Sequence, residues 1–133
     1  QFRLFTAYQC SRHRDSDMAA MNYAEYRSMI EDSAVRTALV EFRDANGALM
    51  AVALVDRLDD GFSAVYTFYD PARDKQSLGT WSILWLVEEC RRQGMPFVYL
   101  GYWIGESPKM AYKARFPALE RLSDGSWIPF AAS

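Results

Sequence analysis

Three strand-like segments joined by tight turns limit what this chain can fold into more than any other feature. Residues 38–42 and 49–55 are rich in aliphatic side chains, and the turn sequence DANG between them contains an Asn-Gly pair typical of hairpins. The tight turn DDG then leads into residues 62–69. Because turns this short join neighbouring antiparallel strands, the sequence predicts a three-stranded antiparallel unit.

Helical patterns lie on both sides of these strands. Residues 1–8 and 22–32 both have a pattern typical of a helix, with apolar side chains of the second at helical spacing. After the third strand, Ser77 is a suitable N-cap for a further helix, which we expect to stop at Gly94. The three predicted strands therefore have helices before and after them.

Two more elements complete the predicted order. Residues 97–100 are almost wholly apolar, which indicates a central strand covered on both faces. Ser107 and Pro108 then predict the start of a last helix, running through Phe116. The order α, β-β-β, α-β-α indicates an α/β (α+β) fold, in which helices flank a mixed sheet, as in the N-acetyltransferase-like (GNAT-like) fold.

Length and composition limit the class of protein. The 133 residues suffice for one domain with a sizeable core, and no apolar stretch is long enough to cross a bilayer. We expect a domain of a longer protein, because the chain opens without Met inside a helical pattern. Two distant cysteines and the single His13 lack the usual spacing of zinc or iron–sulfur ligands. Isolated thiols are typical of a reduced, cytoplasmic protein. The net charge of −2 means that nucleic acid would need a local basic patch.

Four longer motifs carry a family resemblance. They are SAVYTFYDP at 63–71, SLGTWSIL at 77–84, YLGYWI at 99–104 and MAYKARF at 110–116. In this order and spacing they resemble the C-terminal domain of the arginyl- and leucyl-tRNA–protein transferases. The segment YQCSRHRD at 8–15 is similar to the region just upstream, where an Arg-His pair is typical. The LGYWI version and the short connections are similar to the bacterial leucyl branch, the aspartate/glutamate leucyltransferases.

The resemblance implies an enzyme of the N-degron pathway of protein degradation. Such an enzyme transfers an aminoacyl group, leucyl in the bacterial branch, from aminoacyl-tRNA to the N-terminal Asp or Glu of acceptor proteins. The partners implied are therefore leucyl-tRNA and proteins with acidic N-termini, with no membrane. Residues 1–133 would form the C-terminal catalytic domain, without the family's N-terminal domain and its cysteine motif. We expect no cofactor and no metal in this part, and a cytoplasmic location.

The implied reaction is attack of a protein α-amine on an ester that is already activated. Orientation of two bound substrates is then worth up to roughly 7–11 kcal/mol. The other needs are a neutral amine, a hydrogen-bond donor for the oxyanion and a proton for the departing ribose oxygen. The catalytic candidates are Tyr69, Asp70, Tyr102 and Lys113. Asp70 could instead form a turn with Pro71, and the tyrosines could instead pack in the core and on the sheet.

A second group of candidates would bind aminoacyl-tRNA. Aromatic rings can stack on the terminal adenosine, basic side chains can contact phosphates, and a helix N-terminus attracts anions. The candidates are Tyr66, Arg73, Lys75, Ser77, Gly79 and Trp103. Packing of the helix on the sheet is an equally simple explanation of Gly79.

A third group would bind the acceptor N-terminus, whose acidic side chain requires a cation. The candidates are Arg12, His13, Lys109 and Arg115. Arg12 suits a carboxylate best, because a guanidinium pairs with it bidentately. Lys109 and Lys113 share one face of the predicted last helix. Solvated surface lysines and a structural histidine are the alternatives.

Other functions remain open at the level of sequence. An arginyl donor is the rival within the family. An acyl-CoA N-acyltransferase of the same fold would carry a second Gly or Ala in its pyrophosphate turn, and this chain has Trp81 there, which disfavours coenzyme A. A non-catalytic module that binds acidic N-termini or tRNA is a third class.

Overall fold

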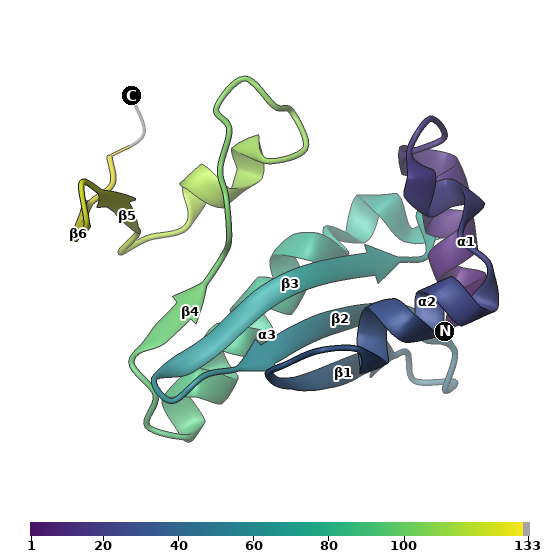
Figure 1. Cartoon of the computed structure of the whole chain (residues 1–133), viewed down its shortest axis with the longest axis horizontal. Helices are drawn as coiled ribbons and strands as arrows, with labels where there is room; N and C mark the ends of the chain where they lie inside the picture. The colour runs from purple at the N-terminus through teal and green to yellow at the C-terminus, as the bar shows by residue number, and fades with distance from the viewer. Residues whose placement is uncertain (132–133) are drawn as a thin grey trace. The chain divides into compact units, whose positions relative to one another are not determined.

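The computed structural model describes residues 1–131. These residues fall into two units, one comprising Gln1–Gly101 and the other beginning at Tyr102 (Figure 1). The first unit contains a four-stranded sheet with helices, and the second contains a short 3-10 helix and a hairpin. No helix within residues 1–131 is long and apolar enough to span a membrane.

The sheet of the first unit confirms the predicted antiparallel strands. β1 (Arg36–Arg43), β2 (Leu49–Arg57) and β3 (Gly61–Tyr69) are consecutive antiparallel neighbours. The Asp44 carboxylate closes the first turn by accepting hydrogen bonds from the backbone N–H groups of Asn46 and Ala48. The mixed sheet is completed by β4 (Phe97–Tyr99), which runs parallel to β3.

The prediction that residues 97–100 form a central strand is wrong. The strand order is β1-β2-β3-β4, so β4 lies at an edge of the described sheet, and Phe97 is 46% exposed. The strand covered on both faces is β2, where residues 51–55 are all buried. The apolar run of β2 is longer than that of residues 97–100, and it was not predicted to form a strand covered on both faces. The shorter run at β4 instead reflects one covered face and a connection to the preceding helix.

Helices cover both faces of the sheet. α3 (Leu78–Arg92) packs through Leu86 and Cys90 on the face that carries Ala51, Ala53 and Val55. α1 (Phe2–Arg12) and α2 (Tyr23–Glu31) pack on the opposite face against Val52 and Phe68. In Figure 1, α3 lies behind the strands and α2 lies in front of them. The alternation along β2 follows from the two-residue period of a strand.

The helix ends explain where the chain turns. α2 begins at Asn22, which forms a capping box with Glu25. α3 begins after its predicted N-cap residue, Ser77, but the Ser77 side chain forms no cap hydrogen bond. The 3-10 helix η2 (Pro71–Gln76) comes directly before it, and Ser77 adopts a left-handed conformation (φ 51°, ψ 45°) between the two helices without a side-chain cap bond. Gly94, at φ 71°, follows the end of α3 as predicted.

Gly61 permits the parallel pairing of β3 with β4. A Cβ atom at this position would lie 1.9 Å from the backbone oxygen of Phe97. The Phe97 N–H also donates to the Asp60 carbonyl at 3.1 Å, which keeps the two backbones close. Only glycine fits this approach without displacing β4.

The second unit differs from the prediction of a last helix through Phe116. Residues 108–110 form a turn, and only η3 (Ala111–Arg115), a five-residue 3-10 helix, follows. Phe116 is extended (φ −70°, ψ 141°) because it precedes Pro117, which disfavours helical backbone at the residue before it. The hairpin of β5 (Glu120–Ser123) and β6 (Ser126–Pro129) was not predicted.

Candidate active site

The C-terminal half of α1 and the end of β3 bring several polar and aromatic side chains together. Tyr8 and Arg12 are four residues apart and share one face of α1. The Tyr8 ring lies 4.9 Å from the ring of Tyr69, centroid to centroid, and the Arg12 guanidinium lies 5.4 Å from the same ring centroid. His13 ends α1, with its ring 5.8 Å from that of Tyr8. We call these four residues and Tyr66 the α1–β3 cluster.

Asp74 of η2 joins two members of this cluster. Its carboxylate accepts a hydrogen bond from the Arg12 guanidinium. It also accepts one from the Tyr69 hydroxyl. Burial raises the pKa of Tyr69, and Asp74 raises it further against the opposing charge of Arg12. The Tyr69 phenol is therefore protonated at neutral pH and can donate.

Tyr66 forms its hydrogen bond with a buried residue of the core. Gln9 is completely buried on α1, and its Nε2 donates to the Tyr66 hydroxyl oxygen at 2.5 Å. Burial raises the pKa of Tyr66, with the Gln9 hydrogen bond acting in the opposite sense. Tyr66 and Phe68 belong to the cluster under α1 and α2, whereas Tyr69 packs with the core under α3, as the alternation along a strand predicts.

Asp70 and Arg73 lie beside the cluster, in ion pairs of their own. Asp70 begins η2, and its Oδ1 accepts from the Ala72 N–H at 3.0 Å. Arg73 Nη2 donates to Asp44 Oδ2 at 2.7 Å, and Arg73 Nε lies 3.4 Å from Asp70 Oδ2. Arg73 lowers the pKa of Asp44. Asp70 therefore caps η2 and Arg73 links η2 to the β1–β2 turn, which gives each a structural role alongside its predicted catalytic or tRNA-binding role.

The remaining candidates of the first unit lie between η2 and α3. Lys75 and Ser77 are exposed, and Gly79 is half-buried in the first turn of α3. The Gly79 carbonyl accepts from the hydroxyl of Ser82, which is buried. Trp81 is 45% exposed and packs its ring edge-on to Phe42, with a centroid distance of 4.7 Å.

Five candidates belong to the second unit. Tyr102 is 91% exposed, and the Trp103 ring packs against Phe130 at a centroid distance of 5.0 Å. Burial lowers the pKa of Lys113, which lies in η3. The prediction that Lys109 and Lys113 share a helix face is wrong, because Lys109 is in the turn before η3. Arg115, at the end of η3, is exposed.

Three residues of this region were not among the predicted site residues: Tyr8, Gln9 and Asp74. Tyr8 and Gln9 open the YQCSRHRD segment, so the resemblance contained a signal for them. Asp74 had none, since its importance arises from its contact with Arg12, which is 62 positions away in the chain.

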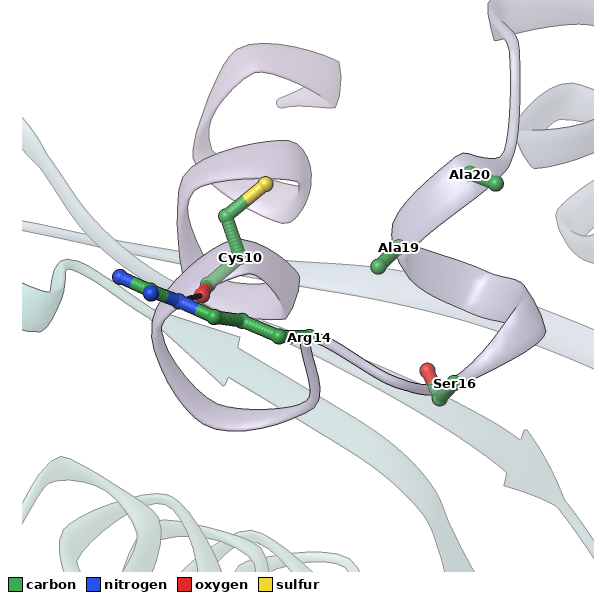
Figure 2. A pocket seen from close by; sticks show the side chains of 5 residues that line it. All are labelled: Cys10, Arg14, Ser16, Ala19 and Ala20. Carbon is green, nitrogen blue, oxygen red and sulfur yellow. Dashed lines mark hydrogen bonds between the residues drawn. The ribbon is translucent and has the colours of Figure 1, made fainter.

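A shallow pocket lies on another side of α1. Its volume is about 380 Å³, and Figure 2 shows its lining residues, Cys10, Arg14, Ser16, Ala19 and Ala20. Arg14 Nε donates to the Cys10 carbonyl at 2.9 Å across its floor. It contains none of the predicted site residues. Within the described part of the chain, no group of three or more His, Cys, Asp or Glu residues is placed to hold a metal ion.

Comparison with known proteins assigns the family. The family model described as "Arginine-tRNA-protein transferase, C terminus" matches residues 1–123. The aspartate/glutamate leucyltransferase of Paramagnetospirillum magneticum is 57% identical over 131 residues, which are 98% of this chain and 54% of that protein. Those of Gluconacetobacter diazotrophicus and Rhodospirillum rubrum are 54% and 53% identical, over 97% and 98% of this chain and 50% and 53% of theirs. The chain thus spans about half the length of the curated relatives that it matches. On this evidence, the chain belongs to the arginine-tRNA-protein transferase C-terminal family.

Proposed function

We propose that this chain is the catalytic C-terminal domain of an aspartate/glutamate leucyltransferase. The enzyme transfers leucine from leucyl-tRNA to the N-terminal Asp or Glu of proteins in the cytoplasm, and so marks them for degradation. The observation that carries the proposal is identity of 57% to an aspartate/glutamate leucyltransferase over 98% of the chain. The α1–β3 cluster supports it with the Arg12 guanidinium over the Tyr69 ring and with two phenols, those of Tyr66 and Tyr69, whose pKa values are raised.

The sheet supports an N-acetyltransferase-like fold for this domain. β3 and β4 are parallel and joined through α3, as that fold requires. Their pairing covers only Gly61–Ser63 with Phe97–Tyr99, so residues 64–69 have no β4 partner. Tyr66 and Tyr69 lie in this part of β3, which pairs with β2 and not with β4. In the proposal, substrates approach this side of β3 and meet the α1–β3 cluster.

Arg12 binds the acidic side chain of the acceptor in this proposal. Its guanidinium presents paired donors that match a carboxylate, and it already holds the carboxylate of Asp74. His13, next to it at the end of α1, supports the same carboxylate. Lys109 and Arg115 of the second unit are further acceptor-binding residues.

The chemistry needs an oriented amine and donors for developing charge. Tyr69 donates to Asp74 in this structure, and in the proposed reaction its hydroxyl turns from that carboxylate to the substrate oxygen, because a donor aimed at the oxyanion stabilises the transition state. Lys113, whose pKa burial lowers, loses its proton more easily than an exposed lysine, and its neutral amine can accept a proton from the acceptor's α-ammonium, which frees the lone pair that attacks the ester. Asp70 and Tyr102 complete the proposed catalytic set. Tyr66, Arg73, Lys75, Ser77, Gly79 and Trp103 bind aminoacyl-tRNA.

A transfer assay with the full-length protein tests the proposal. Labelled leucyl-tRNA and arginyl-tRNA are each supplied with peptides that begin with Asp, Glu or Ala. Leucine on Asp and Glu peptides, with none on Ala, is the expected result. Arginine transfer would overturn the donor and keep the reaction, as the description of the family model allows. Absence of transfer from either tRNA by folded protein would overturn the proposal.

A further inference from the structure

Gln9 is an unusual side chain for the core of this protein. It is completely buried, and of the described residues only Ser82 is another buried polar side chain. The Ser82 hydroxyl is satisfied, since it donates to the Gly79 carbonyl at 2.8 Å. Gln9 is only half satisfied: its Nε2 donates to Tyr66, but its Oε1 is buried without a partner in the described structure. A buried amide oxygen without a partner destabilises the folded protein.

Packing alone does not explain this amide. Phe5, one turn earlier on α1, is buried in the apolar cluster with Val52 and Phe68. Methionine at position 9 would fill a similar volume without an unpaired polar atom. The presence of Gln9 therefore indicates a role for its hydrogen bond to Tyr66.

That hydrogen bond fixes what Tyr66 can do. A phenol oxygen has one hydrogen to donate and can also accept. When Tyr66 accepts from Gln9, its own hydrogen must point to another group, and no acceptor for it is found among residues 1–131. Gln9 is buried whereas the Tyr66 side chain is partly exposed, so of the two residues only Tyr66 has surface that a substrate can contact.

We propose that Gln9 is a positioning residue that holds the Tyr66 hydroxyl as a donor to the ester carbonyl oxygen of aminoacyl-tRNA. This inference rests on the proposed transferase function. In the reaction, the α-amine nitrogen forms a bond to the carbonyl carbon, and the electron pair of the carbonyl moves to oxygen. Tyr66 donates to that oxygen without giving up its proton. When the carbonyl forms again, the bond to the ribose oxygen breaks, and that oxygen receives the proton lost by the amine.

Substitution of Gln9 by glutamate provides the sharpest test. An ionised carboxylate at position 9 can only accept, so it draws the Tyr66 hydrogen towards the core and away from substrate. A protonated carboxyl has nearly the shape of the amide and can donate again. Gln9→Glu in the full-length enzyme should therefore lose about tenfold or more in kcat at pH 8 and recover as the pH falls towards about 6.

The charged and titratable groups around position 9 come from four elements. They are Tyr66 and Tyr69 on β3, Tyr8, Arg12 and His13 on α1, Tyr26 on α2, and Asp74 on η2. The titration of these groups also affects the wild type. At each pH, kcat of the variant is therefore divided by kcat of the wild type measured in parallel. Thermal melting at each pH shows that the variant is folded. KM for leucyl-tRNA should change less than about twofold, because Gln9 does not touch the substrate.

A double-mutant cycle separates positioning from general damage to the fold. Gln9→Met should lower kcat at every pH, and Tyr66→Phe should lower it at least as much. In the Tyr66→Phe background, Gln9→Met should have no further effect, because its partner is gone. Full activity of Gln9→Glu at pH 8, or losses that multiply in the double variant, would overturn the inference. Failure of the wild type to transfer leucine would instead overturn the proposed function.

Discussion

The Asp74 carboxylate on η2 accepts a hydrogen bond from the Arg12 guanidinium on α1. Arg12 is the predicted site residue that suits a carboxylate best. The same Asp74 carboxylate accepts from Tyr69. In the proposed function, Arg12 must bind the carboxylate of an N-terminal Asp or Glu. Asp74 therefore occupies the position of a substrate carboxylate and competes with the acceptor for Arg12.

Asp74→Asn should bind acidic acceptors more tightly. The amide keeps the shape of the side chain but removes the competing charge. Because the side chains of Arg12 and Asp74 are 36% and 62% exposed, their ion pair is worth at most about 1 kcal/mol. KM for Asp and Glu peptides should fall by up to about fivefold, and Asp15→Asn, an exposed change, should leave it unaltered. An unchanged or raised KM in Asp74→Asn would contradict this competition.

Gly61→Ala should destabilise the first unit. The added methyl would clash with the backbone oxygen of Phe97, which side-chain rotation cannot relieve. We expect a loss of roughly 1–3 kcal/mol in the free energy of unfolding, measured in urea. Ser63→Ala on the same strand is the control, because it inserts nothing between β3 and β4. Equal stability of Gly61→Ala and the wild type would show that β4 is not held at this distance.

The Asp44–Arg73 ion pair should make stability depend on acid pH. Arg73 lowers the pKa of Asp44 below its ordinary value, so the folded state binds fewer protons there than the unfolded state. Its contribution is present above the unfolded pKa of about 4 and is lost as the pH falls through the lower folded value. The melting temperature of Asp44→Asn should therefore fall less than that of the wild type between about pH 5 and pH 2. The described ion pairs do not include Asp59, which is exposed, so Asp59→Asn should follow the wild type. Parallel curves for all three proteins would refute the assignment.

Lys113 should control the pH dependence of transfer. If its neutral amine accepts a proton from the acceptor's α-ammonium, and so generates the amine that attacks, kcat rises with pH as Lys113 loses its own proton. Burial lowers its pKa, so this rise should lie below the ordinary range of lysine, near 10.4. Lys113→Arg keeps a cation that does not lose its proton, so the rise of kcat with pH should disappear. Its kcat at pH 8 should fall at least about tenfold. If the rise of kcat with pH persists in Lys113→Arg, it belongs to another group.

The sequence predicted the first three strands because local signals there agree with the tertiary structure. The aliphatic runs and the DANG turn specify β1 and β2 without help from the rest of the chain. The position of β4 depends on its long-range partner, and three residues do not encode it. The prediction of the last helix was wrong because the residues after Ser107-Pro108 form a turn, and only the 3-10 helix Ala111–Arg115 follows before Phe116-Pro117. The hairpin at Asp124-Gly125 carried a clear local signal, because an Asp-Gly pair is typical of a type I′ turn. Both residues adopt the positive φ that this turn requires.

A residue of the candidate site could be predicted only where it lies within a motif that the sequence analysis recognised. The resemblance provided Arg12 and His13, and the end of the third strand provided Tyr66 and Tyr69. Gln9 and Asp74 owe their importance to partners 57 and 62 positions away. Their residue types did not indicate a role in the site, because glutamine in a helix and aspartate in a turn are ordinary surface residues.

Acceptor selection by Arg12 variants tests the central claim most directly. Leucyl transfer by the full-length enzyme is measured with peptides that begin with Asp, Glu, Asn or Ala, for the wild type, Arg12→Met and Arg12→Lys. Arg3→Met, an exposed change more than two turns earlier on α1, is the control. We predict that the wild type and Arg3→Met use Asp and Glu only. Arg12→Met should lose at least about tenfold in kcat/KM for both, with partial retention in Arg12→Lys. Undiminished use of Asp and Glu by folded Arg12→Met would contradict the account.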